Sequence, residues 1–454
     1  MAKYEIPSEV YKTAMPIIHL QSVLADISDE NIEESKEIIL NLKLTKTQTG
    51  LVYICQDILF NAKIHFNKID IYSKFVIELC KEIPNLQQLV NRKLLLPASD
   101  SRTKCIHIRM LRYFFEHETI SLDEIISGIA NFPLQLSNQY MLFFLVFGKF
   151  IERKHPDVFR EICIKVKNLQ GLGPTYTSFR NNEFREIITR SAESDFKWQI
   201  PEETILYGYA KESIPYYIRS NNYQYIRNLS QQQLDNLYDF SPFDPIPFES
   251  GKCTLTQLAS ISGSFKSLRH IMSMKAKIRN TDSNGNSPAP YAVAGGSMPI
   301  IKSIHDRMID MDDFLPLAAH CRGIDAFEYI LSLIEDETKK KELLNKSLLE
   351  CAASNNLAVL LVCISYGASL KTKNNEGQTA IHLAALNDNL FIAKILSMFP
   401  DFNPNVQDDA GDTPLHLAAK QGNIGIINFL MGLPSIKKDI KNNYGKTALD
   451  ATKE

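Results

Sequence analysis

Apolar residues recur at helical spacing over most of the segment 8–170. In the segment 51–62 they occupy positions 51, 54, 55, 58, 59 and 62, which lie on one face of an α-helix. Ser121 and Glu124 form the sequence signature of a capping box and predict another helix start. The same spacing predicts further helices over 69–83, 106–116, 140–154 and 158–167. Because no stretch alternates with the period of a strand, we expect a helical array or bundle.

Two clusters of glycine and proline interrupt this pattern, at 170–174 and at 241–247. Between them lies a tyrosine-rich segment, in which 214–229 has amphipathic spacing that favours degenerate, repeat-like helices. The chain therefore divides into three expected parts. These are a helical N-terminal region of unknown function over 1–175, a transition segment over 176–248 and a repeat region over 249–454.

Within the repeat region, a glycine placed two positions before a threonine recurs at equal intervals, at Gly377, Gly411 and Gly445. A tight turn before a helix favours positive φ, which glycine adopts without a steric cost. The threonines that follow, Thr379, Thr413 and Thr447, are residues that cap helices. Gly422 is placed to end the first helix, and the apolar run from 424 to 430 predicts a second one.

The motif Thr413-Pro414-Leu415-His416, its relative from Thr379 to His382 and their period resemble the ankyrin repeat, a unit of about 33 residues. The resemblance implies an all-α fold, in which a helical N-terminal array precedes a solenoid of helix-turn-helix units with β-turn fingers. Such helix pairs cannot bury their own apolar faces, so stacking supplies the core. The wider arrangement is similar to the large expanded ankyrin families of unicellular parasites, whose helical N-terminal region has no assigned function.

The units can be counted by a small alanine near the end of each first helix. These alanines are Ala259, Ala292, Ala318, Ala352, Ala384 and Ala418. They predict about six units, of which the one around 285–312 is shortened, because the step from Ala292 to Ala318 is smaller than the others. The part closest to the family consensus is 374–441, and a partial last unit begins near 442.

Composition changes this picture little. The chain has 454 residues, of which 44% are hydrophobic and 22% charged, and its net charge is −2, so it has no general attraction to nucleic acid or to anionic membranes. Its eight cysteines are scattered without a C-x-x-C pair, which indicates reduced thiols. The first residues lack the apolar core of a signal peptide, and the apolar run 141–147 is too short to cross a bilayer. We therefore expect a cytoplasmic location.

Residues that invite catalytic interpretations have structural alternatives. The resemblance implies that His382 and His416 hydrogen-bond neighbouring loops. The segment 445–447 matches the end of a phosphate-binding loop, but Ile440 stands where that motif requires its first glycine. Cys105, His107 and His117 lack a further ligand at metal-binding spacing. We expect no catalytic site, cofactor or metal, and an enzyme hidden in residues 1–248 is the third and weakest of the functional hypotheses.

Binding remains as the expected function. In ankyrin arrays the turn tips and the exposed side of the first helix form a concave recognition face. Carried over by position, that face comprises Asn375, Glu376, Gln378, Leu386, Asn387, Asp409, Asp412, Lys420, Gln421, Asn443, Tyr444 and Lys446. Mixed charge around one aromatic anchor favours a protein partner over nucleic acid or a membrane.

We therefore predict a non-enzymatic protein–protein interaction module or scaffold. The alternative is an adaptor whose N-terminal helices dock on a larger complex such as a ubiquitin ligase while the repeats select the client. The identity of the partner, the oligomeric state and the order of the last partial unit stay open.

Overall fold

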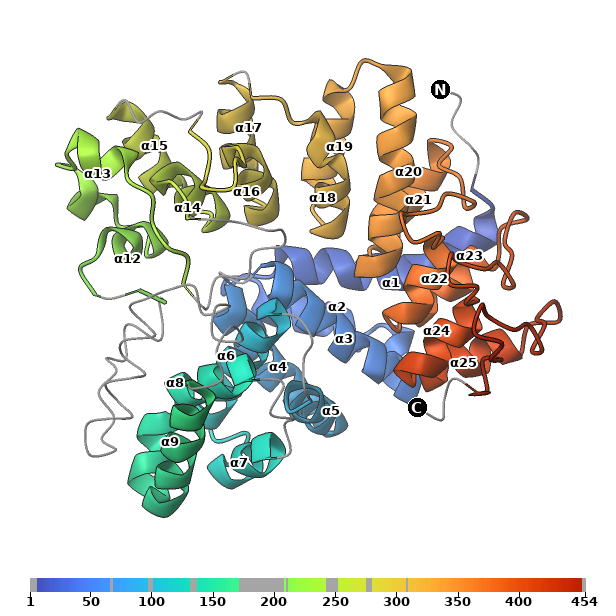
Figure 1. The fold of residues 1–454 in the computed structure, drawn as a ribbon, viewed down its shortest axis with the longest axis horizontal. Helices are drawn as coiled ribbons and strands as arrows, with labels where there is room; N and C mark the ends of the chain where they lie inside the picture. Colours follow the sequence, from blue (N-terminus) through green and yellow to red (C-terminus); the bar gives the residue numbers. More distant parts are fainter. Residues whose placement is uncertain are drawn as a thin grey trace. The chain divides into compact units, whose positions relative to one another are not determined.

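The fold was obtained as a computed structural model and is all-α (Figure 1). The structure describes residues 6–65, 68–96, 101–130, 137–170, 208–209, 211–241, 252–274, 280–307 and 309–450. Within these ranges the only β pairing consists of two isolated bridges, Tyr238 with Cys253 and Lys441 with Thr447. The all-α class predicted from the sequence is therefore confirmed.

The chain packs as two compact units, one of residues 23–304 and one of residues 1–22 together with 305–454. These units do not coincide with the boundaries expected near 175 and 248. The first helix, α1 (Ser8–Asp26), contributes its initial turns to the unit that contains the C-terminal repeats. The sequence-based boundaries followed composition and breaks in periodicity, which do not report packing between distant segments.

In the unit of residues 23–304, the first helices alternate between two rows. Their bounds are α2 Ile32–Leu40, α3 Gln48–Ile64, α4 Ile69–Glu82, α5 Pro84–Leu94, α6 Ser101–Glu116, α7 Leu122–Ala130, α8 Ser137–Lys154 and α9 Pro156–Gln170. Helices α2, α4, α6 and α8 contact one another in that order, and α3 contacts α5. This arrangement is an array of successive helix pairs, which decides between the array and the bundle expected from the sequence.

Local signals place the ends of these helices. The hydroxyl of Thr47 accepts the N–H of Gly50 at 3.0 Å, so α3 begins before the apolar run that predicted it. The predicted capping box is present, because Ser121 and Glu124 each accept the other's backbone N–H, at 3.2 and 2.9 Å. Among the described helices none is both long and apolar enough to cross a membrane, and the run 141–147 lies within α8.

The other helices in the described residues of this unit are short. They are α12 Ile214–Arg219, η5 Tyr223–Ile226, α13 Gln231–Asp235, α14 Leu255–Ile261, α15 Phe265–Ser273 and α16 Pro288–Gly295, followed by α17 Met298–His305 at its end. The segment 214–229, over which degenerate repeat-like helices were expected, contains α12 and η5, separated where Asn221 has a φ of 53° that an α-helix does not allow. Most of the predicted transition segment lies outside the described residues.

The second unit contains four helix pairs in its described residues. They are α18 Leu315–His320 with α19 Ile324–Leu333, α20 Glu337–Ser354 with α21 Leu357–Ser365, α22 Ala380–Leu386 with α23 Leu390–Leu396, and α24 Pro414–Gln421 with α25 Ile424–Met431. The first helices contact in series from α18 to α24, orange to red in Figure 1. Every alanine used to count the units lies in a first helix and is fully buried, which confirms its packing role.

Two deviations from a regular unit have visible causes. The short step between Ala292 and Ala318 arises because only residues 306–314 separate α17 from α18. Helix α20 follows α19 after only the short link 334–336, and it runs for 18 residues. The first turns of α20 therefore stand where a long loop precedes the corresponding helices α22 and α24.

Asparagine side chains tie neighbouring helix pairs together at the start of the second helices α21, α23 and α25. The Nδ2 atoms of Asn356, Asn389 and Asn423 each donate to a backbone carbonyl oxygen in the first helix of the preceding helix pair, at 2.8 Å. Gln21 of α1 makes an equivalent tie, because its amide donates to the Asn355 carbonyl at 2.6 Å and accepts the Leu357 N–H at 3.2 Å. These two bonds explain why residues 1–22 pack with the C-terminal helix pairs.

Candidate functional site

Three loops, here called fingers 1, 2 and 3, follow the second helices α21, α23 and α25. They comprise residues 366–379, 397–413 and 432–447. Each contains a tight turn that begins at an Asn or Asp, at equivalent positions of successive fingers: Asn374, Asp408 and Asn442. In each turn the Oδ1 atom accepts the backbone N–H groups two and four residues later, at 2.8 to 3.1 Å.

The sequence interpretation did not single out these three residues, although their period matched that of the glycines. An Asn or Asp three positions before the turn glycine was the available signal, because short polar side chains fold back on their own backbone. Asp282, before α16, accepts the N–H groups of Asn284 and Asn286 in the same way, at 2.8 Å each.

The turn glycines have the predicted conformation. Gly377, Gly411 and Gly445 have φ values of +74°, +76° and +73°, and Gly422 ends α24 with φ of +70°. A side chain at Gly411 would also collide with the next finger, because its Cβ would lie 2.7 Å from the backbone N of Asn443. At Gly445 a Cβ would meet no atom within 4 Å.

Adjacent finger tips are joined by backbone hydrogen bonds. The N–H of Asp409 donates to the Glu376 carbonyl at 3.1 Å, and the N–H of Asn443 donates to the Ala410 carbonyl at 3.0 Å. The close approach that excludes a side chain at Gly411 is the same approach that permits the second bond. The three tips therefore form one continuous edge, which we call the tip edge.

His382 and His416 fix fingers 2 and 3 to the first helix of the preceding helix pair. The Nδ1 atom of His382 accepts the backbone N–H of Thr379 at 3.2 Å, while its Nε2 donates to the Asp412 carbonyl in finger 2, at 3.1 Å. His416 repeats both bonds, to Thr413 at 3.2 Å and to the Lys446 carbonyl in finger 3 at 3.0 Å. The structural interpretation of these histidines is confirmed.

An amide makes the same pair of bonds in the other unit. The Oε1 atom of Gln257 accepts the N–H of Thr254 at 2.8 Å, and its Nε2 donates to the Asn286 carbonyl at 2.7 Å. Like each histidine, Gln257 uses one acceptor atom toward a capping threonine and one donor atom toward a carbonyl in the next loop. The bridge therefore depends on this geometry and not on imidazole chemistry.

His382 is held neutral by its surroundings. The side chain is fully buried, and desolvation lowers its pKa below the ordinary value of 6.5, against the opposing effect of its hydrogen bond to the Asp412 carbonyl. Since Nδ1 accepts and Nε2 donates, the ring carries its single proton on Nε2. A second proton on Nδ1 would face the N–H of Thr379 and break the cap.

The residues expected to contact a partner fall into three groups by exposure. The exposed ones are Asn375, Glu376, Asn387, Asp409, Lys420, Gln421, Asn443 and Tyr444, and the half-buried ones are Leu386 and Lys446. Tyr444 is 76% exposed. Gln378 and Asp412 are only 7% and 2% exposed, so their expected place on the recognition face is corrected here.

Asp412 is buried because it supports the fingers from within. One carboxylate oxygen is bound by the ammonium of Lys420, and the other accepts the Nδ2 of Asn442 at 2.8 Å. Gln378 and Asp412 both follow a turn glycine, where the chain turns back toward the helices. Lys420 keeps part of its surface in solvent, but its charge is neutralised by Asp412.

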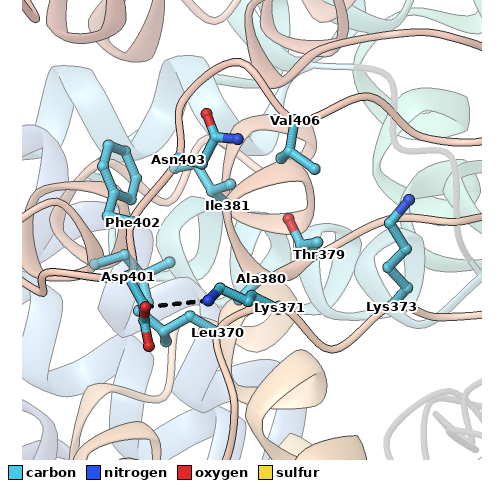
Figure 2. A pocket seen from close by; sticks show the side chains of 11 residues that line it. Leu370, Lys371, Lys373, Thr379, Ala380, Ile381, Asp401, Phe402, Asn403 and Val406 are labelled. Atoms are coloured by element: carbon cyan, nitrogen blue, oxygen red, sulfur yellow. Dashed lines mark ion pairs between the residues drawn. The ribbon is translucent and has the colours of Figure 1, made fainter. Parts of the chain in front are cut away.

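A cavity of about 240 Å³ lies between fingers 1 and 2 (Figure 2). Its lining residues are Leu370, Lys371, Lys373, Thr379, Ala380, Ile381, Leu396, Asp401, Phe402, Asn403 and Val406. At the rim, Lys371 Nζ lies 3.2 Å from Asp401 Oδ1, the pair joined by a dashed line in Figure 2. The cavity contains none of the residues expected to contact a partner.

Three cysteine thiols in the N-terminal helices have the environment of structural residues. Burial raises the pKa of Cys55, Cys80 and Cys163 to about 12, whereas a reactive thiol needs a lowered pKa. Among the residues that the structure describes, no group of three or more His, Cys, Asp or Glu side chains converges at metal-binding distances.

Two turn glycines, the buried Gly411 and the exposed Gly445, provide a matched pair for testing finger packing. Gly445→Ala should cost about 1 kcal/mol, from positive φ alone. Gly411→Ala should cost at least about 1 kcal/mol more, because the added Cβ displaces the backbone of finger 3. Urea unfolding followed by circular dichroism measures both, and equal losses would contradict the close contact between fingers 2 and 3.

The His382 bridge predicts a pH dependence of stability. The unfolded state takes up a proton on this residue below its ordinary pKa of about 6.5, before the folded state does, so stability is retained above that pH and falls below it. His382→Gln, which copies the side chain at Gln257, should retain both hydrogen bonds and remove this contribution. The stability difference between wild type and variant should therefore change between about pH 7.5 and pH 5.5, to the variant's advantage. If the urea midpoints of wild type and His382→Gln differed by the same amount at every pH in this range, the bridge would be contradicted.

Comparison with known proteins agrees with this geometry. A family model described as ankyrin repeats (many copies) matches residues 364–418 and 395–450. No curated protein matches the chain. The likeness to the expanded families of unicellular parasites stays a prediction. The matched residues contain all three fingers with the helix pairs α22–α23 and α24–α25, and this segment is similar to ankyrin repeats, as its motif and period predicted.

Proposed function

We propose that the tip edge of fingers 1 to 3 binds a protein partner and that the chain acts as a non-enzymatic interaction module. Ankyrin repeats are generally such modules. The observation that carries the proposal is the pair of backbone bonds, from Asp409 to Glu376 and from Asn443 to Ala410, that makes one edge of three tips. A surface fixed in advance loses little conformational entropy when it binds.

The exposed side chains on this edge define the kind of partner. Glu376 and Asp409 give it two carboxylates, and Tyr444 adds a large aromatic side chain that is 76% exposed. Tyrosine is enriched among the residues that dominate binding energy, and carboxylates favour basic groups on the partner. The partner surface therefore combines basic side chains with a contact for one aromatic ring.

The buried carboxylate of Asp412 has no part in this surface. Its bonds to Lys420 and Asn442 hold fingers 2 and 3, so a charge reversal there would damage the scaffold itself. No feature of the described helices between residues 23 and 170 favours the adaptor alternative, which stays a prediction.

The test compares full-length wild type with Asp409→Arg/Tyr444→Ala as baits. A matched control is Asp325→Arg/Tyr225→Ala, which changes an exposed carboxylate and an exposed tyrosine that do not belong to the fingers. Proteins captured by wild type and control but lost from the double variant are then purified. We expect the double variant to bind them at least about tenfold more weakly in calorimetry. The same captured proteins and affinities for all three baits would place the function elsewhere in the chain.

A further inference from the structure

The cavity between fingers 1 and 2 offers a second surface that the tip edge does not use. Its volume of about 240 Å³ is below the range of about 300–1,000 Å³ that holds drug-sized ligands and cofactors. It exceeds the space of about 150 Å³ that accommodates a benzene molecule. The cavity therefore fits one large apolar side chain better than a whole nucleotide or cofactor.

The inner wall offers apolar contact more than hydrogen bonds. Leu370, Ile381, Leu396, Phe402 and Val406 provide most of it (Figure 2). Two polar residues of the lining, the buried Thr379 and the exposed Asn403, already make hydrogen bonds within the chain. The hydroxyl of Thr379 is hydrogen-bonded to the Nδ1 atom of His382 at 3.0 Å. The Oδ1 of Asn403 accepts the N–H of Asn405 at 3.0 Å.

Exposed lysines flank the cavity and continue to finger 3. They are Lys371 and Lys373 in finger 1, with Lys437, Lys438 and Lys441 in finger 3, against two exposed carboxylates outside the tip edge, Asp401 and Asp439. This local excess of positive charge contrasts with the net charge of −2 for the whole chain. A surface of this sign attracts an acidic partner.

Equivalent positions in the three fingers are connected, so Lys373 and Lys441 stand in one row with Gln407 between them, here called the lysine row. Lys373, Gln407 and Lys441 occupy the same place in successive fingers. The Nζ of Lys373 donates to the Gln407 carbonyl at 3.2 Å, and the Nε2 of Gln407 donates to the Lys441 carbonyl at 3.1 Å. The row thus begins at the rim of the cavity and passes along all three fingers.

The ion pair at the rim leaves this charge available. The side chains of Lys371 and Asp401 are 73% and 70% exposed, and an ion pair so open to water contributes little to stability. Carboxylates of a partner can therefore compete with Asp401 for Lys371. Asp401 itself disfavours a phosphate chain at this point.

We propose that the cavity and the lysine row bind an extended acidic segment of a partner protein, one large apolar side chain of which enters the cavity. Carboxylates on either side of that side chain contact Lys371 and Lys373. This site is separate from the tip edge, with which it shares no residue, and its charge is opposite. The chain can thus hold a basic surface at its tips and an acidic segment beside them.

Two peptides probe the site on the full-length protein. Both carry a fluorescein label and acidic flanks of alternating Asp and Glu, and they differ only in a central Phe or Ala. In fluorescence anisotropy the Phe peptide should bind at least about tenfold more tightly than the Ala peptide. Its affinity should fall with added salt, since charge contacts contribute.

Variants separate the apolar and the charged contributions. Lys371→Glu/Lys373→Glu should weaken the Phe peptide at least about tenfold, whereas Lys266→Glu/Lys346→Glu, with the same change of charge at exposed sites elsewhere, should not. Val406→Trp puts a larger side chain at a half-buried lining position, so it should fill the cavity and abolish the preference for Phe while keeping the salt dependence. Asp409→Arg/Tyr444→Ala should leave peptide affinity undiminished, which distinguishes this site from the tip edge.

Three results would overturn the proposal. One is equal affinity for the Phe and Ala peptides, and another is the absence of binding by the correctly folded wild type. The third is tighter binding of a single-stranded oligonucleotide of the same charge, competing with the peptide, which would assign the lysine row to phosphates.

Discussion

The bridge between a helix start and the next finger is the interaction on which the repeat structure depends. At His382 and His416 one ring accepts the backbone N–H of the capping threonine and donates to a carbonyl in the following finger. A single planar group thus satisfies a helix terminus and positions a loop from the next unit. Gln257 makes the same bridge with an amide, so the requirement is a donor and an acceptor at fixed separation.

Rigid fingers follow from this bridge and from the turns themselves. The Oδ1 atoms of Asn374, Asp408 and Asn442 close each turn, and the asparagines at the opposite ends of the helices tie the pairs together. The fingers are therefore attached at their base and to one another at their tips. Their two sides differ in charge, with Glu376 and Asp409 at the tips and the lysine row beside the cavity. Such a division allows one set of loops to contact partners of opposite charge.

Local signals in the sequence were sufficient for the helices, for Thr379 and Thr413 as helix caps and for the turn glycines, whereas no described helix follows Thr447. Each of these depends on a few neighbouring residues, and the positive φ values of Gly377, Gly411 and Gly445 agree with the prediction. The roles of the two histidines also followed from the family resemblance. Burial of Gln378 and Asp412 did not follow, because it depends on the direction in which the chain returns from each turn.

Long-range packing could not be read from local pattern. Gln21 lies 334 residues before its partner Asn355, and a single glutamine in an amphipathic helix carries no signature of that contact. The cavity likewise arises from residues of two fingers that only the folded chain brings together. The division of the chain at residues 22 and 304 has the same origin, since it reflects packing and not composition.

Amide hydrogen exchange at Asp409 and Asn443 tests the central claim most directly, because these two N–H groups join the finger tips. If the fingers form one rigid edge, both amides exchange slowly, at rates comparable to those of amides inside helices α22 and α24. In His382→Ala the bridge from α22 to finger 2 is lost, so the Asp409 amide should exchange faster than in wild type. Exchange of both amides in the wild type at the rate of an unstructured peptide would contradict the account.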